Sequence, residues 1–385
     1  MTKIKQVLND NIRKFGMIIA LVGIMILFEI LTSGILLTPL NITNIIMQNS
    51  YVIVLAIGMM LVIITGEIDL SVGSVAAFIG AIAGVLLVTH DLPVYVAILL
   101  CLLIGAGIGA WQGLWIAYFN IPSFIVTLAG MLIFRGLTLV VLNGRTLAPF
   151  PDSFRSLSSS FLPDWFNGSN LNIIAIVLGI VFTIAFIFVE INNRRTDLKY
   201  GYTTSSFPAF IAKLVVLSIV INIFTYTLSK YAGIPYVLII LLILVLGYSF
   251  VMNRMVVGRR IYAVGGNESA AQLSGIKTKK VKFWTFVNMG VLAALAGLIF
   301  AGRLNAATPQ AGNLFELDAI AAAVIGGASF TGGVGTIFGA VIGALVMGVL
   351  NNGMSLMGIG IDWQQAIKGL VLLGAVAFDV MNKNK

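Results

Sequence analysis

Long apolar runs separated by short polar breaks are the main pattern along this chain. A helix needs about 20 apolar residues to cross a bilayer. Runs near that length cover residues 16–37, 44–65, 71–89, 94–119, 123–142, 171–191, 208–229, 235–253, 284–302, 334–357 and 363–381. A shorter stretch at 317–330 is either a full crossing or a re-entrant segment. The pattern predicts an all-α polytopic membrane protein with about 10 to 12 transmembrane helices.

Composition supports lipid as the solvent for most of this surface. Of the 385 residues, 59% are hydrophobic and only 10% are charged, whereas soluble domains carry roughly a quarter charged residues. The run at 16–37 exceeds the apolar part of a cleaved signal peptide, which is about 7–15 residues. We therefore expect it to be the first transmembrane helix.

The basic residues indicate an orientation. Most of the 23 Lys and Arg residues fall in 1–15, 192–207, 254–283 and the C-terminal tail, and such residues concentrate in cytoplasmic loops. The pattern predicts a multi-pass protein of the plasma or inner membrane, with both termini cytoplasmic and an even number of crossings. Residues 1–385 then form a single transmembrane domain, with 254–283 as a cytoplasmic loop and 143–170 as an external loop.

Glycines punctuate several of the apolar runs. Gly105, Gly109 and Gly113 recur at four-residue spacing, which allows helices to approach closely. The glycine-containing segments 66–73 and 326–333 each precede a glycine-rich run. Paired broken helices of this kind point to a transporter's substrate pathway. Whether they reflect an internal repeat stays open.

Motifs for catalysis are absent from the sequence. It has no Gly-x4-Gly-Lys-[Ser/Thr] phosphate loop, and its single histidine, His90, excludes a His-rich metal site. The one cysteine, Cys101, lies in an apolar run and forms no intrachain disulfide. We expect a transport subunit with no cofactor or metal of its own. An enzyme acting on lipids through acidic pairs at the membrane boundary is a minor alternative.

The segment 254–283 contains a local helix signal within a basic loop. Asn267 and Glu268 favour a helix start, and Gly275 favours its end. A capped helix of about two turns between membrane helices, with exposed Ala and Leu, is typical of a docking element. The alternative is a basic loop that only fixes topology.

Polar residues inside apolar segments are candidates for a substrate pathway, because unpaired polar groups are costly in lipid. Glu67 and Asp69 either contact a substrate, cap half-helices or pair with Arg135. The candidates are Glu67, Asp69, Ser71, Ser74, Arg135, Asn143, Asn351 and Asn352.

Several motifs together resemble one family. Glu268-Ser-Ala270-Ala271-x3-Gly275 is similar to the Glu-Ala-Ala-x3-Gly coupling motif of ABC importer permeases, with one extra residue after the Glu. The longer string 258–275, with the strings at 66–74, 122–130, 316–322, 325–335 and 351–355, resembles the ribose/galactose/xylose-type permeases. The long middle region resembles the D-xylose branch of that family.

The resemblance implies a permease that imports a monosaccharide, D-xylose in that branch, with Asn267, Glu268, Ala270, Ala271 and Gly275 contacting a separate ATPase. ATP and Mg would then bind that partner. It also implies a second permease copy forming a homodimer, a soluble sugar-binding protein outside and a lipid environment, with no role for nucleic acid.

The external loops 143–170 and 303–316 are the expected surface for the binding protein, with Arg303, Asn305 and Glu316 as candidate contacts. Two other transport mechanisms stay open. An ion-coupled secondary sugar transporter would use Glu67 and Asp69 as coupling carboxylates, and a channel would need no coupling loop.

Overall fold

The computed structural model describes residues 2–166, 168, 171–202, 204 and 206–383. Within this part, nine helices are long and apolar enough to cross a membrane, which confirms the polytopic all-α fold. They are α2 (Pro39–Ile64), α3 (Val72–Gly84) continued by η1 (Val85–Thr89), α4 (Val94–Ala117), α5 (Ser123–Leu142), α7 (Ile173–Lys199), α8 (Phe207–Ser229), α9 (Tyr236–Arg254), α12 (Thr278–Leu304) and α14 (Ile337–Leu356).

The chain divides into two compact units. Unit 1 comprises 1–36, 45–159 and 237–385, and unit 2 comprises 37–44 and 160–236. The remaining helices all belong to unit 1: α1 (Thr2–Leu31), α6 (Asp152–Ser159), α10 (Val256–Gly266), α11 (Glu268–Leu273), α13 (Phe315–Ile325) and α15 (Ile361–Lys383).

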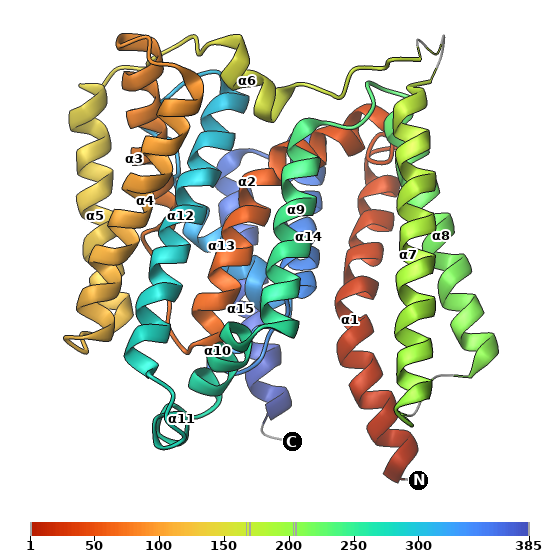
Figure 1. The fold of residues 1–385 in the computed structure, drawn as a ribbon. Coiled ribbons are helices and arrows are strands. Elements are labelled where there is room, and N and C mark those ends of the chain that lie inside the picture. Colours follow the sequence, from red (N-terminus) through yellow and green to blue (C-terminus); the bar gives the residue numbers. More distant parts are fainter. Residues whose placement is uncertain (1, 167, 169–170, 203, 205, 384–385) are drawn as a thin grey trace. The chain divides into compact units, whose positions relative to one another are not determined.

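Helix α12 lies at the centre of one side of unit 1, where it packs against α4 and α3 (Figure 1). The expected glycine face of α4 makes this contact. A methyl group at Gly109 would lie 2.3 Å from the carbonyl oxygen of Phe286, so only glycine permits this helix spacing. Helix α5 packs on α3 beside them.

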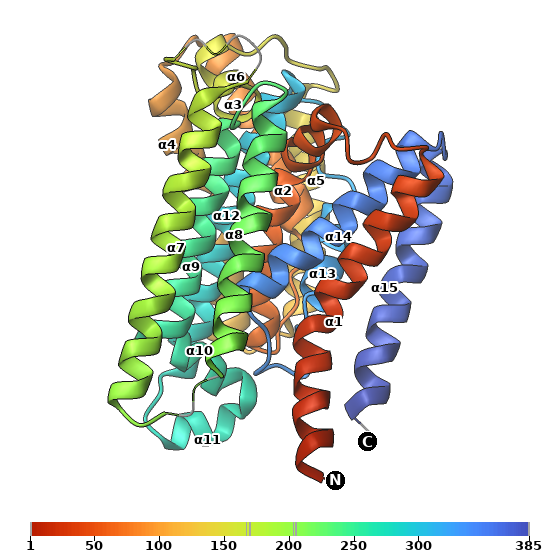
Figure 2. The ribbon, with the colours of Figure 1, turned by 90° about the vertical axis from the view of Figure 1, so that its right-hand side faces the viewer.

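On the other side of unit 1, α14 packs against α1 and α13, and α13 also contacts α15 (Figure 2). Phe28, Ile45 and Leu350 contribute to a buried apolar cluster between α1, α2 and α14. Helix α13 has 11 residues and is therefore about 16 Å long, which is half of the hydrocarbon core. The stretch 317–330 is too short to cross, so its interpretation as a full crossing is wrong.

Unit 2 consists mainly of the helix pair α7 and α8. Gly179 of α7 faces Thr225 of α8, and Lys213 forms a 2.7 Å ion pair with Glu190. Our interpretation of 192–207 as a loop is wrong for its first half, because α7 continues to Lys199. Its charged last turns extend the helix beyond the apolar run.

One end of unit 1 brings together three parts of the chain. The beginning of α1, the end of α15 and the short helix α11 all lie at this end, in both views (Figures 1 and 2). The basic segment 254–283 forms α10, α11 and the start of α12 there. This arrangement agrees with the pattern of basic residues along the chain.

Candidate functional site

Helix α11 begins and ends where the local sequence signals predict. The Oδ1 atom of Asn267 accepts a hydrogen bond from the Ala270 backbone N–H at 2.9 Å, which is an N-cap. Gly275 takes a φ of +81° just after the helix, a conformation that favours glycine. Ala271 is buried, whereas Leu273 is 90% exposed. Helix α11 therefore presents an apolar side chain outward.

The chain between α2 and α3, residues 65–71, forms the first broken segment. Its Ile68 backbone N–H donates to the Ser123 hydroxyl of α5 at 3.1 Å. Asp69 accepts hydrogen bonds from both the backbone and the hydroxyl of Ser71, and the Gln112 amide donates to that hydroxyl at 2.7 Å. Burial raises the pKa of Asp69 to about 6, and the Ser71 hydrogen bonds oppose this shift.

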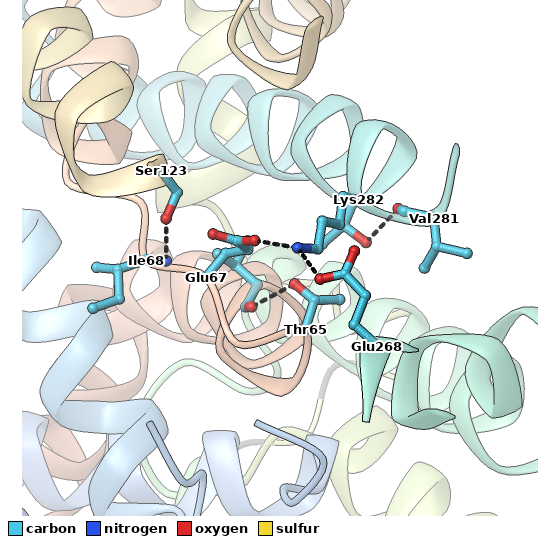
Figure 3. A network of polar contacts seen from close by, with 9 residues as sticks. Thr65, Glu67, Ile68, Ser123, Glu268, Val281 and Lys282 are labelled. Carbon is cyan, nitrogen blue, oxygen red and sulfur yellow. Dashed lines mark hydrogen bonds and ion pairs between the residues drawn. The ribbon is translucent and has the colours of Figure 1, made fainter. Parts of the chain in front are cut away.

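Lys282, the fifth residue of α12, joins the first broken segment to α11. Its Nζ atom lies 2.8 Å from a carboxylate oxygen of Glu67 and 2.7 Å from one of Glu268 (Figure 3). We name these three side chains the Lys282 bridge. The Lys282 and Glu67 side chains are only 16% and 15% exposed. Attraction between charges is stronger in such a sheltered place than in water.

Helix α10 contacts the end of α2 and the second glycine-containing segment. The second broken segment, residues 326–336, follows α13, and its Gly333 backbone N–H donates to the Ile64 carbonyl at the end of α2 at 2.8 Å. Gly265 of α10 lies against both of these groups, and the Tyr262 hydroxyl donates to the Gly335 carbonyl at 2.7 Å. The second broken segment therefore meets the end of α2, just before the first broken segment, at α10.

Arg135 does not pair with Glu67 or Asp69, so that alternative is wrong. Its guanidinium donates instead to the backbone carbonyls of Ala311 and Gly312, at 2.8 and 3.2 Å. The reason is topological, since α5 passes the loop that precedes α13. Arg135 thereby fixes the approach of that loop.

The other pathway candidates do not gather at one place. Ser74 is fully buried and its hydroxyl has no partner in the described residues. Asn351 and Asn352 lie on α14, which packs against α1 and α13. Asn143 is exposed at the end of α5, with a φ of +50°, so our placement of it inside an apolar segment is wrong. A left-handed Asn commonly ends a helix in this way.

The two expected external loops are paired with each other in unit 1. The backbones of Leu147 and Ala307 exchange hydrogen bonds of 3.0 and 2.9 Å, and Asn305 accepts one from the Phe150 N–H. Arg303 is partly buried at the end of α12. Glu316 is only 7% exposed, so our interpretation of it as a surface contact is wrong. It lies in the first turn of α13 against Gly73.

A cavity of about 640 Å³ opens beside the basic segment 254–283. Its walls are mostly apolar, with aromatic residues and three cations, and no carboxylate lines it. The lining residues include Tyr248, Arg260, Lys277, Lys280, Trp284 and Asn288. Among the described residues, no group of three or more His, Cys, Asp or Glu side chains is placed to hold a metal ion.

Sequence reasoning missed α10 and the contacts of Lys282. Helix α10 is short and glycine-containing in a basic segment, and its contacts with Ile64, Gly333 and Gly335 are more than 60 positions away in the chain. Lys282 carried no distinguishing local signal, because Lys277, Lys279 and Lys280 belong to the same basic stretch.

Comparisons with known proteins agree on one family. Residues 41–376 match the family described as "Branched-chain amino acid transport system / permease component". The chain is 40% identical to the xylose transport system permease protein of Escherichia coli K12, over 97% of this chain and 93% of that protein. It is also 40% identical to the Haemophilus influenzae protein of the same name, over 100% of both chains.

A ribose import permease is more distant. The Escherichia coli K12 protein of that name is 35% identical, over 88% of this chain and 85% of that protein. No solved structure matches this chain.

Proposed function

This chain belongs to the permease-component family of ABC importers, and on that premise we propose that the sugar it moves is D-xylose. It is the transmembrane permease subunit of an ABC-type sugar importer, and ATP hydrolysis belongs to a separate subunit. Support for D-xylose comes from the full-length similarity to two xylose permeases at 40% identity, against 35% over 88% of the chain for a ribose permease.

We propose that α11 is the contact for the ATPase. The observation that carries this proposal is the position of α10 and α11, which together contact both broken segments through the Lys282 bridge and Gly265. A partner protein that binds the exposed face of α11 can therefore act on both segments. Asn267, Glu268, Ala270, Ala271 and Gly275 shape this helix and the turn that ends it, and the exposed Leu273 adds an apolar contact.

The same end of unit 1 would face the cytoplasm, where an ATPase finds ATP. The beginning of α1 and the end of α15 would then be cytoplasmic too. The paired segments around Leu147 and Ala307 would lie outside and receive a sugar-binding protein. Two permease copies forming a homodimer would complete the assembly.

Part of the sugar pathway is proposed to follow the polar groups next to α3. Ser74 is buried with an unpartnered hydroxyl, and Ser71 lies close by in a network with Asp69 and Gln112. Hydroxyl and amide groups of this kind replace water around sugar hydroxyls at low cost. Glu67 contributes to the Lys282 bridge instead.

The test is uptake of radiolabelled D-xylose into proteoliposomes that contain the permease and its ATPase, with ATP inside and the binding protein outside. We expect uptake to require both ATP and the binding protein and to be unaffected by an uncoupler. Excess unlabelled D-xylose should compete better than L-arabinose, D-ribose or D-galactose.

Two results would contradict the proposal. Uptake driven by an ion gradient without either partner would identify a secondary transporter. Passive flux in both directions would identify a channel.

A further inference from the structure

The Lys282 bridge crosses the boundary between the proposed ATPase contact and the membrane core. Glu268 is the first residue of α11, Lys282 is the fifth residue of α12, and Glu67 belongs to the first broken segment. Glu268 and Lys282 are 14 positions apart, whereas Glu67 is distant from both in the sequence. One ammonium group therefore links all three elements (Figure 3).

Breaking the contact between Lys282 and Glu67 costs more than breaking the contact between Lys282 and Glu268. Lys282 and Glu67 are 16% and 15% exposed, whereas Glu268 is 45% exposed. Removing one partner of a sheltered ion pair leaves the other charge without compensation, which is strongly unfavourable. Lys282 therefore keeps its contact with Glu67, and a movement of α11 that carries Lys282 with it also moves the first broken segment.

The first broken segment is in turn attached to the membrane helices. Its Ile68 backbone bonds to Ser123 at the start of α5. Further along α5, Arg135 holds the backbone carbonyls of Ala311 and Gly312, just before α13. A displacement of Glu67 thus acts on α5 and, through it, on the chain that leads into the half-length helix α13.

We propose that Lys282 is a positioning residue for energy coupling, which transmits movement of α11 to the first broken segment through Glu67. This inference rests on the proposed ATPase contact of α11 and adds the residue through which that contact acts. The inference requires that the bridge has two states and that ATP binding favours one of them, because coupling is a free-energy difference between states.

The test uses the complete importer in proteoliposomes, with Ile68→Cys as a reporter in the first broken segment. The native Cys101 is fully buried and gives a low background with a maleimide. Labelling is measured without nucleotide and with ATP plus vanadate, and D-xylose uptake per ATP hydrolysed is measured in parallel. Lys282→Met and Glu67→Gln are compared with Lys280→Met, an exposed lysine half a turn away on the same helix.

We expect the parent protein to label at different rates in the two nucleotide states. Lys282→Met and Glu67→Gln should lose this difference and lower uptake per ATP by at least about fivefold, the lower end of typical coupling effects. The double variant should be no worse than either single variant. Lys282→Arg should retain most of the effect, and Lys280→Met should behave as the parent.

The inference is overturned if Lys282→Met keeps the nucleotide-dependent labelling, or if the parent reporter does not respond to nucleotide at all. The labelling readout needs no sugar. Failure of D-xylose uptake in the parent would therefore count against the proposed substrate and leave the test of Lys282 intact. Co-purification of the ATPase with each variant shows that the assembly has formed.

Discussion

The backbone N–H of Gly333 donates to the carbonyl of Ile64 at 2.8 Å, and Gly265 lies against both groups. This contact brings the end of α2 and the second broken segment together at α10. The space beside these two groups has no room for a side chain at position 265. A Cβ at Gly265 would lie 1.6 Å from the Ile64 oxygen and 2.7 Å from the Gly333 nitrogen.

Gly265→Ala is therefore expected to destabilise the permease. Backbone cannot move aside as a flexible side chain can, so we expect a loss of about 1–3 kcal/mol, as for other overpacked sites. Thermal unfolding of the purified protein in detergent measures the effect. Gly266→Ala is the matched control, because nothing lies within 4 Å of a Cβ there. Equal melting temperatures for the two variants would show that α10 is not packed as described.

Leu273→Ser is expected to weaken ATPase binding without affecting folding. The side chain is 90% exposed, so the fold loses little apolar contact. A central apolar contact in an interface commonly contributes about 2 kcal/mol, which is roughly a 30-fold change in affinity. Titration of the ATPase onto immobilised permease measures this. Leu198→Ser, at a 58% exposed leucine of unit 2, should bind normally, and an unchanged affinity for Leu273→Ser would exclude this side chain from the contact.

Glu268→Lys is expected to abolish ATP-driven uptake. It places a second ammonium next to Lys282, whose Nζ now lies 2.7 Å from the Glu268 carboxylate, and repulsion should displace α11. Uptake in proteoliposomes with ATP inside is the measurement. Glu190→Lys removes an ion pair of similar length in unit 2 and should retain uptake. Normal uptake by Glu268→Lys would rule out α11 as the coupling contact.

Arg135→Lys is expected to destabilise the protein despite conserving charge. A lysine lacks the planar fork that donates to Ala311 and Gly312 together. One buried carbonyl would then lose its partner, at a cost of about 1–3 kcal/mol. Thermal unfolding and uptake should both report the change. Arg145→Lys, at an exposed position after α5, is the control and should melt as the parent does.

The sequence was informative where structure is local. Nine of the apolar runs predicted helices that are long and apolar enough to cross a membrane in the described residues, and Asn267 with Gly275 predicted both ends of α11. These features depend on length, hydropathy and capping, all of which act over a few residues. The short stretch at 317–330 was ambiguous because apolar content alone does not say where a helix ends.

The partners of the charged groups were much less predictable. Glu67 had Arg135 as an apparent partner, yet the structure gives it Lys282, more than 200 positions along the chain. Burial of Glu316 was missed for the same reason, since it depends on how α13 packs next to Gly73. Such contacts follow from the packing of whole helices, which no local pattern encodes.

The unequal exposure of the Lys282 bridge has a consequence for ionic strength. Dissolved salt screens charges that water reaches and has much less effect on sheltered ones. Glu268 is 45% exposed, while Lys282 and Glu67 are 16% and 15% exposed. A rise in potassium chloride should thus loosen the attachment of α11 while the link between α12 and the first broken segment persists. Osmotic stress that raises the salt concentration in the cell would then act on this importer through the contact between Lys282 and Glu268 alone.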